Sequence, residues 1–153
     1  MPQTRLISLM LSAICLAVLP QLASAQCRPV AGTIDATVVG GDPVNVLGNV
    51  NGDLAGSTRA ILTGQSEGEN GTVNLTLKHD FVTHGRSSLS TSDTAVWTPV
   101  PGHQGVFHMA TDYKIDGGTG AYSGATGSLI NDGVADTNTG LVTLRYSGEV
   151  CTD

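Results

Sequence analysis

Charged residues make up only 13% of this 153-residue sequence, and aromatic residues only 4%. A typical soluble domain carries about 25% charged residues, so a coiled coil or an acidic tail is not expected here. After Val30, apolar residues spaced at i, i+3, i+4 and i+7 are never sustained over three turns, which argues against a long helix. The chain is instead rich in Val, Thr, Leu, Ser and its 20 Gly, a composition that favours a single β-rich domain.

Several motifs of cofactor and nucleophile chemistry are missing. The sequence has no G-x-S-x-G elbow and no C-x-x-C pair, and its glycine-rich segment 116–127 follows neither the dinucleotide fingerprint nor a helical pattern. Three pairs of possible zinc ligands lie close in sequence, and none has a recognised zinc spacing. They are His79 with His84, His103 with His108, and His108 with Asp112. Segment 136–140 matches part of a calcium loop without its bidentate Glu and predicts a hairpin turn. We therefore expect neither a cofactor nor a metal.

The net charge is −6, and the few Lys and Arg are scattered along the chain. Binding of phosphate groups needs a clustered basic face, so nucleic acid is not an expected partner. An anionic membrane surface is disfavoured for the same reason.

Residues 1–25 carry the features of a secretory signal peptide. Arg5 precedes an apolar run from Leu6 to Leu19, and the small residues 23–25 form an A-x-A cleavage site before Gln26. The run is shorter than the roughly 20 residues of a spanning helix, so no membrane span is expected. The sequence predicts a secreted or periplasmic protein whose mature domain is residues 26–153. Acylation at Cys27 is a weaker alternative, because a lipobox needs a small residue where Gln26 stands.

Two cysteines, Cys27 and Cys151, remain after cleavage, since Cys15 leaves with the signal peptide. In an oxidising compartment they are expected to form a disulfide, worth roughly 5 kcal/mol in the chain-entropy model for so long a loop. The bridge would hold the two ends of the domain together. The first and last strands are therefore expected to be neighbours.

Short β-branched stretches separated by Gly, Asn, Asp and Pro predict strands at 32–39, 50–62, 72–83, 87–98, 105–116, 127–134 and 141–150. Turn signals lie at 40–43, 68–71, 99–102 and 138–140. Several strands alternate, with inward sets such as Val73, Leu75, Leu77, His79 and Phe81, or Leu89, Thr91, Asp93, Ala95 and Trp97. One dry and one wet face per strand indicates an antiparallel sheet. We expect an all-β closed antiparallel barrel of about eight strands, with a β-sandwich as the alternative.

The pattern Gly117-Gly118-Thr119-Gly120-x-Tyr122, followed by Ala125 and Gly127, resembles a segment shared by plant allene oxide cyclases and dirigent proteins. Together with the ending 139–148, it is similar to small secreted bacterial proteins of that barrel superfamily. The resemblance implies an eight-stranded barrel, often a homo-oligomer, whose lumen binds small apolar molecules and in some members guides a cyclisation. Apart from the resemblance, the same glycines predict a tight turn, with Tyr122 plugging one end of the barrel.

The titratable residues on the dry faces are Asp93 and His79, with Tyr113 and Tyr146 as hydroxyl partners. Burying such groups is costly unless they are paired. Asp93 and His79 are therefore either hydrogen-bonded structural residues or catalytic groups for proton transfer, oriented by the two tyrosines.

Three functions remain open from the sequence. The leading one is a secreted barrel that binds a small apolar ligand and, if it is an enzyme, acts as a cofactor-free isomerase or cyclase through positioning. The alternatives are a non-catalytic carrier and a structural or surface protein whose barrel is filled by its own side chains. The sequons at Asn70 and Asn74 matter only in a cell that glycosylates.

Overall fold

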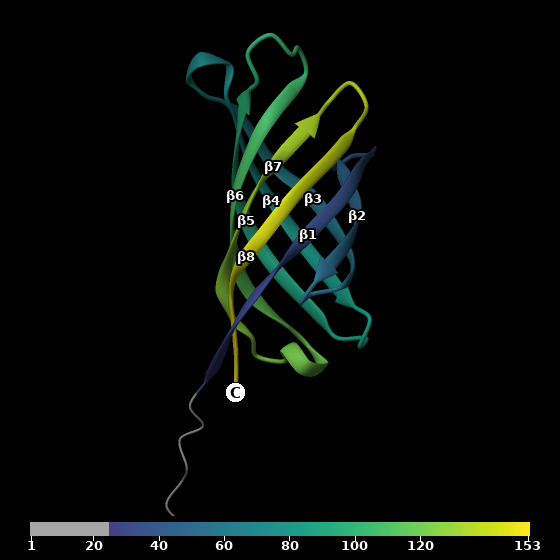
Figure 1. Ribbon diagram of the computed structural model, residues 1–153, viewed down its shortest axis with the longest axis vertical. Coiled ribbons are helices and arrows are strands. Elements are labelled where there is room, and N and C mark those ends of the chain that lie inside the picture. Colours follow the sequence, from purple (N-terminus) through teal and green to yellow (C-terminus); the bar gives the residue numbers. More distant parts are fainter. Residues whose placement is uncertain (1–24) are drawn as a thin grey trace, which may run out of the picture.

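The computed structural model describes residues 25–153, which form one closed barrel of antiparallel strands (Figure 1). Each strand pairs with its neighbours in sequence, and the last pairs with the first. The predicted barrel is thus confirmed, and the sandwich alternative is excluded. In chain order the elements are β1 (Gln26–Gly40), β2 (Asn45–Gly52), β3 (Gly56–Glu67), the 3-10 turn η1 (Glu69–Gly71), β4 (Val73–Thr83), β5 (Ser88–Pro99), β6 (Val106–Thr119), the 3-10 turn η2 (Gly120–Tyr122), β7 (Thr126–Asp136) and β8 (Leu141–Thr152).

The barrel closes through β1 and β8, which pair along almost their whole length. Cys27 stands directly opposite Cys151 in this register, and the two are joined by a disulfide. The predicted bridge and the predicted neighbouring of the first and last strands are both confirmed. Of the predicted signal peptide, residues 1–24 lie outside the described residues.

The single strand predicted at 50–62 is wrong, and the first strand begins at Gln26 rather than at residue 32. Residues 50–62 do not form a single strand, because β2 ends at Gly52 and β3 begins at Gly56. Gly52 has a φ of +92°, which suits glycine, and the Asp53 carboxylate accepts a hydrogen bond of 2.8 Å from the Ala31 backbone N–H. The turn also buries Leu54 completely. An apolar residue inside the turn made the segment look continuous.

The inward faces predicted for β4 and β5 are confirmed, and β6 and β8 alternate in the same way. The burial pattern alternates along each of these strands, and buried apolar residues of every strand except β3 form one core. Asp93 is among them at 3% exposure, as the alternation on β5 predicts.

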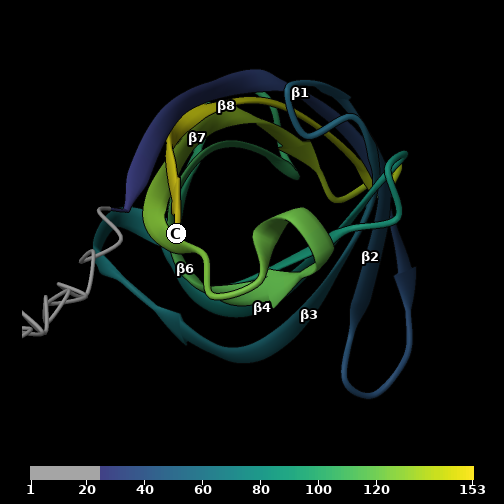
Figure 2. The same cartoon turned by 90° about the horizontal axis from the view of Figure 1, so that it is seen from below.

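The end of the barrel that carries the chain termini, called the terminal end below, is filled by large side chains. Tyr122, the last residue of η2, is buried, and Figure 2 shows this turn lying across the opening. The Tyr122 hydroxyl accepts a hydrogen bond of 2.8 Å from Arg28. A Cβ on Gly118 would lie 2.8 Å from the Tyr122 Cβ and 2.1 Å from the Ser88 carbonyl oxygen, so only glycine fits there. The predicted tyrosine plug is confirmed.

The opposite end, called the loop end below, carries the connections at 41–44, 68–72, 100–105 and 137–140. The last of these is a hairpin turn, as predicted, in which the Asp136 carboxylate accepts a 2.9 Å hydrogen bond from the Asn138 backbone N–H. This bond lowers the pKa of Asp136 below its ordinary value. The Asn138 side-chain amide donates a second bond, of 3.0 Å, to the same carboxylate, so Asp136 stabilises the chain reversal.

Candidate functional site

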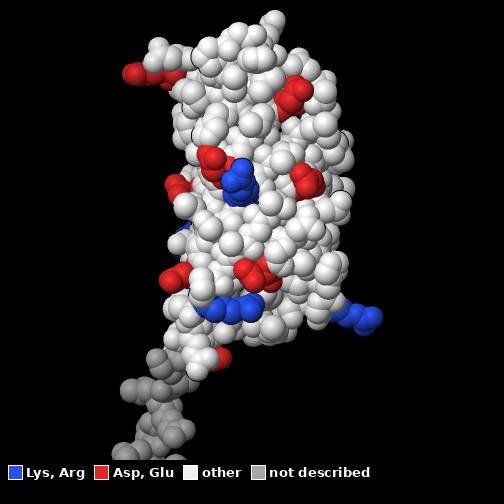
Figure 3. All heavy atoms as spheres, in the orientation of Figure 1, with Lys and Arg blue, Asp and Glu red and all other residues white. Residues whose placement is uncertain are grey.

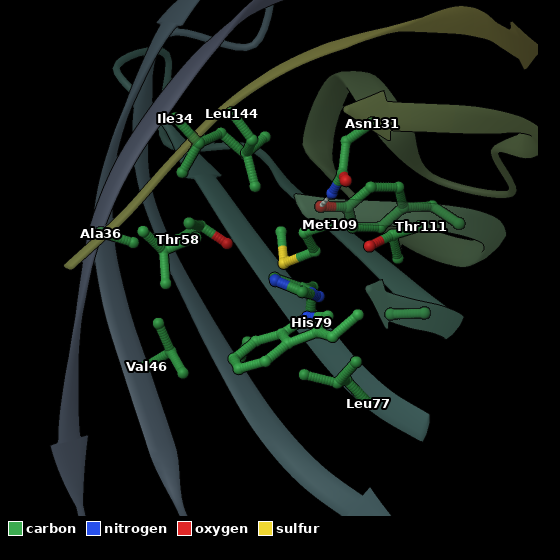
Figure 4. Close-up of a pocket in the computed structure, with 15 residues that line it drawn as sticks. Ile34, Ala36, Val46, Thr58, Leu77, His79, Met109, Thr111, Asn131 and Leu144 are labelled. Carbon is green, nitrogen blue, oxygen red and sulfur yellow. Dashed lines mark hydrogen bonds between the residues drawn. The ribbon is translucent and has the colours of Figure 1, made fainter. Parts of the chain in front are cut away.

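A cavity of about 50 Å³ lies inside the barrel, in the half nearer the loop end. Its walls are mostly apolar, with a few polar groups from β3, β4, β6 and β7 (Figure 4). The lining residues are Ile34, Ala36, Val46, Thr58, Ala60, Leu77, His79, Ala95, Trp97, Met109, Thr111, Tyr113, Asn131, Val142 and Leu144. A single water needs roughly 10–15 Å³ of such space, so the cavity has room for several water-sized groups.

His79 and Asp93 form the charged centre of this lumen. The Nδ1 atom of His79 hydrogen-bonds the Oδ2 atom of Asp93, and the Thr91 hydroxyl donates a 2.6 Å bond to the other carboxylate oxygen. Because a carboxylate accepts and does not donate, Nδ1 carries the proton of this bond, which leaves Nε2 as the ring nitrogen that Asp93 does not use. The Asp93 side chain is fully shielded, whereas that of His79 is 12% exposed and lines the cavity. His79, not Asp93, is therefore the group that a lumen ligand can touch.

Tyr113 stands directly across from Asp93 on the neighbouring strand β6. Its ring packs edge-on against His79, with centroids 5.1 Å apart, and its hydroxyl accepts a hydrogen bond from the Asn131 amide. Burial, and secondly the charge of Asp93, raise the pKa of Tyr113 well above its ordinary value. The phenol therefore stays neutral and keeps a proton to donate.

Trp97 and Met109 lie opposite each other on β5 and β6 and close the cavity toward the loop end. The Trp97 ring packs against Phe107 with centroids 5.7 Å apart. Met109 projects toward His79 in Figure 4. A thioether side chain is unbranched and flexible, so this wall can repack more easily than one of β-branched residues.

Two buried polar atoms have no hydrogen-bond partner among residues 25–153, and both belong to residues that line this cavity. They are Nε1 of Trp97 and Oδ1 of Asn131. Buried polar groups are almost always satisfied by protein or by another molecule. Both residues stand on the inner wall of the barrel, so the interior there is not uniformly apolar.

The structure thus brings three of the four predicted site residues together, namely His79, Asp93 and Tyr113. Tyr146 lies apart from them, nearer the terminal end. Its hydroxyl accepts a 3.0 Å bond from the Leu54 backbone N–H and donates one of 3.0 Å to the Asn51 carbonyl. These bonds tie β8 to the β2–β3 turn, and they leave Tyr146 no part in the lumen cluster.

Sequence reasoning did not single out Asn131, Thr91 or Thr111 for the site. Asn131 follows Leu129 by two residues on β7, so strand alternation alone would have placed it inside. Thr91 was assigned to the inner face without a role, and its bond to Asp93 depends on side-chain geometry that the pattern does not contain.

Within residues 25–153 no group of three or more His, Cys, Asp or Glu side chains is arranged to hold a metal ion. No helix of the described residues is long and apolar enough to cross a membrane.

The outer surface differs from the lumen. The face seen in Figure 3 carries isolated acidic and basic groups separated by uncharged stretches, with no large patch of one sign. An exposed pair, His108 and Asp132, is joined at 2.5 Å, with side chains 52% and 77% exposed. It offers a solvent-accessible counterpart to the buried pair of the lumen.

No protein-family model and no curated protein matches the sequence. Among solved structures, the chain is similar to one described as "Structure of the pterocarpan synthase dirigent protein GePTS1". The two share 15% sequence identity, the match covers 87% of this chain and 88% of that chain, and the TM-score is 0.46. The allene oxide cyclase and bacterial parts of the sequence resemblance stay predictions.

Proposed function

We propose that this barrel binds a small, mainly apolar molecule in its lumen. The observation that carries the proposal is the cavity itself, whose apolar walls bear a few converging polar groups. Sites of this composition are typical of small-molecule binding. A volume of about 50 Å³ is well below the roughly 300 Å³ of a drug-sized site, so the ligand is a small one, or Met109 repacks to admit it.

The single tryptophan of the chain lines the cavity, so its emission reports on the lumen alone. The test is a titration with cyclohexanone, followed by the emission maximum of Trp97 and by ligand-observed NMR. Binding is expected to saturate. Ala95→Leu, which fills the cavity, should abolish it, whereas Val96→Leu, the next residue on the outer face, should not.

The overpacked Ala95→Leu variant carries a risk of misfolding, and Ala60→Val is a milder second filling variant. A filled lumen that still binds the probe, in a variant shown to be folded, would contradict the proposal. It would move the search to the outer face and favour the structural role.

A second candidate function is a cofactor-free isomerase or cyclase, favoured by the His79–Asp93 pair. In this scheme His79 Nε2 removes a proton from a carbon next to a carbonyl, and the electron pair of that C–H bond moves onto the carbonyl oxygen. That oxygen accepts a hydrogen bond from a neutral donor, for which the lumen offers the Tyr113 hydroxyl. For an unsaturated ketone whose C=C bond is conjugated with the enolate, the electron pair returns from the oxygen and the proton is placed on the far carbon of that bond, which completes an isomerisation that needs no cofactor.

Proton transfer can be tested without knowing the substrate. In D₂O, the wild-type protein should speed the exchange of the hydrogens next to the carbonyl of bound cyclohexanone, as observed by NMR. His79→Gln should remove the acceleration while leaving the fold intact, and His108→Gln, on the exposed pair, is the matched control. Binding without exchange would leave the carrier as the function.

We further propose that the protein works in an oxidising compartment, secreted or periplasmic. The Cys27–Cys151 bridge supports this, because such bonds persist outside the reducing cytosol. Mass spectrometry of protein from its native source should find a mature chain that begins at Gln26. A chain that retains residues 1–25 and has Cys27 and Cys151 as free thiols would contradict the proposal.

A further inference from the structure

His79 presents one ring nitrogen to the lumen. Its Nδ1 atom is bound to Asp93, and its Nε2 atom makes no hydrogen bond within residues 25–153. Among those residues, the buried polar atoms without a partner are Trp97 Nε1 and Asn131 Oδ1, so His79 Nε2 keeps accessible surface. Because this side chain points inward from the middle of β4 and is 12% exposed at the cavity wall, that surface faces the lumen.

The His79 ring is held in place on its other sides. Phe81 stacks against it with ring centroids 5.7 Å apart, and Tyr113 packs edge-on at 5.1 Å. Asp93 is itself fixed by the Thr91 hydroxyl through a bond of 2.6 Å. Figure 4 shows the His79 ring in the midst of the lining side chains. A ligand therefore meets Nε2 at a fixed position, and little ordering of the protein opposes binding.

Other polar groups of the cavity wall already have partners. The Thr58 hydroxyl donates to the Asp80 carbonyl oxygen at 3.1 Å, and the Tyr113 hydroxyl accepts from the Asn131 amide. The walls around them are apolar. His79 Nε2 has no such partner, so hydrocarbon that covered it would displace water from the ring nitrogen without replacing the bond, which opposes binding.

The size and the chemistry of the cavity together limit what can bind to Nε2. A volume of about 50 Å³ holds roughly four waters, whose share of the liquid is about 120 Å³, the volume of a five- or six-membered ring with one small substituent. A hydroxyl substituent suits Nε2 in either protonation state, because it donates to a bare nitrogen and accepts from a protonated one. A carbonyl suits only the protonated state, and a hydrocarbon suits neither.

We propose that the lumen binds a small alcohol, an apolar molecule of about six non-hydrogen atoms whose single hydroxyl hydrogen-bonds His79 Nε2. The apolar body lies against the walls, and the hydroxyl replaces the water that the ring nitrogen otherwise binds. This inference rests on the proposed binding function and names the class of ligand that the same cavity takes.

The test compares cyclopentanol with cyclohexene, which have the same number of non-hydrogen atoms and differ in the hydroxyl. Dissociation constants are measured by ligand-observed NMR with the full mature protein. The double variant His79→Phe with Asp93→Val removes the ring nitrogens together with their carboxylate, so no buried charge is left unpaired. It should weaken the binding of cyclopentanol about tenfold or more and change that of cyclohexene by less than about threefold.

The exposed pair provides the matched control. His108→Phe with Asp132→Val makes the same two changes on the outer face and should leave both dissociation constants as they are in wild type.

A second measurement needs no change in the lumen, so it does not depend on how the double variant folds. In the wild-type complex with cyclopentanol, an intermolecular NOE should join the C–H proton beside the hydroxyl to the ring protons of His79. The protons on the far side of the cyclopentane ring should give weaker contacts to His79. Contacts from the far side alone would place the hydroxyl elsewhere and overturn the inference.

The outcomes separate this inference from the function on which it rests. If neither molecule binds the wild-type protein, the proposed binding function fails. If both bind and the lumen double variant weakens neither, or weakens both alike, the lumen is a binding site but the hydroxyl does not bind to His79. The inference is then overturned, and the Thr111 hydroxyl on the cavity wall would be the next group to replace.

Discussion

His79 and Asp93 form a hydrogen-bonded pair inside the barrel, across the neighbouring strands β4 and β5, with the Asp93 side chain fully shielded from solvent. Both Asp93 oxygens are used, one by His79 and one by Thr91. The Asp93 carboxylate therefore holds the His79 imidazole in position, and the carboxylate itself does not reach the lumen. In the proposed proton transfer Asp93 is a positioning residue, and His79 is the group that touches the ligand.

Removing the Asp93 carboxylate should destabilise the barrel. Asp93→Ala leaves His79 and Thr91 without their buried partner, and we expect a loss of about 3 kcal/mol in the free energy of unfolding. Urea denaturation measures it. Asp132→Ala breaks the exposed pair with His108 and should cost less than about 1 kcal/mol. An Asp93→Ala protein as stable as the wild type would refute the structural role of the pair.

Tyr113 makes stability depend on pH in the alkaline range. Its pKa is raised in the folded protein, so above about pH 10 the unfolded chain loses this proton while the native one keeps it. The stabilising contribution is complete below about pH 10 and declines by about 1.4 kcal/mol per pH unit above it.

The measurement is urea unfolding from pH 9 upward, in wild type and in Tyr113→Phe. The variant should lose stability less steeply as pH rises, by the equivalent of one proton. Tyr146 has its pKa raised as well, chiefly by burial, so Tyr146→Phe should also flatten the curve. Equal slopes in wild type and Tyr113→Phe would show that the phenol ionises alike in both states.

Strand alternation was sufficient to predict most of the interior. It placed His79, Asp93 and Tyr113 on inward faces, and the two remaining cysteines predicted the closure of β1 on β8. It could not say which inward residues meet, because that depends on the register between strands. Tyr146 has the same inward pattern as Tyr113, yet it hydrogen-bonds the β2–β3 turn.

The β2–β3 turn shows a second limit of pattern reasoning. Asn51, Gly52 and Asp53 form a turn signal, but the buried Leu54 directly after them continues the apolar pattern of a strand. Leu54 is inside because the turn folds over the terminal end of the barrel. A turn that also serves as a plug contains residues of both kinds, so periodicity cannot distinguish it from a strand.

Gly32 should tolerate no side chain. A Cβ there would lie 1.9 Å from the Asn51 carbonyl oxygen and 2.5 Å from the Tyr146 hydroxyl. Gly32→Ala therefore displaces the tyrosine that holds the β2–β3 turn, and we expect a loss of about 3 kcal/mol by thermal or urea unfolding. Gly85→Ala is the control, since its nearest neighbour would be the Thr83 hydroxyl at an ordinary 3.8 Å. Comparable losses in both variants would contradict this explanation.

The disulfide should stabilise the barrel without shaping the cavity. Replacing Cys27 and Cys151 by Ser removes a link between residues 124 apart in sequence, and we expect a loss of about 2–5 kcal/mol. Wild-type protein treated with a reductant should show the same loss. Because the bridge lies at the terminal end and the cavity in the other half, the folded double variant should bind cyclohexanone as tightly as wild type. Weaker binding at a temperature where the variant is fully folded would argue against this separation.

Met109 should set the size of the ligand that the lumen admits. It lines the cavity and is 7% exposed, and truncating a buried Met to Ala typically costs about 2–5 kcal/mol while leaving extra space. Met109→Ala should therefore be less stable than wild type but should bind cyclooctanone, which is larger than cyclohexanone, more tightly than wild type does. Part of the lost stability should return at saturating ligand, since a molecule that binds only the native state raises its stability. Met109→Leu keeps the volume and should change neither property by much. If Met109→Ala showed no gain for the larger ring, the wall that limits the cavity would lie elsewhere, and Trp97 on the facing strand would be the next residue to shorten.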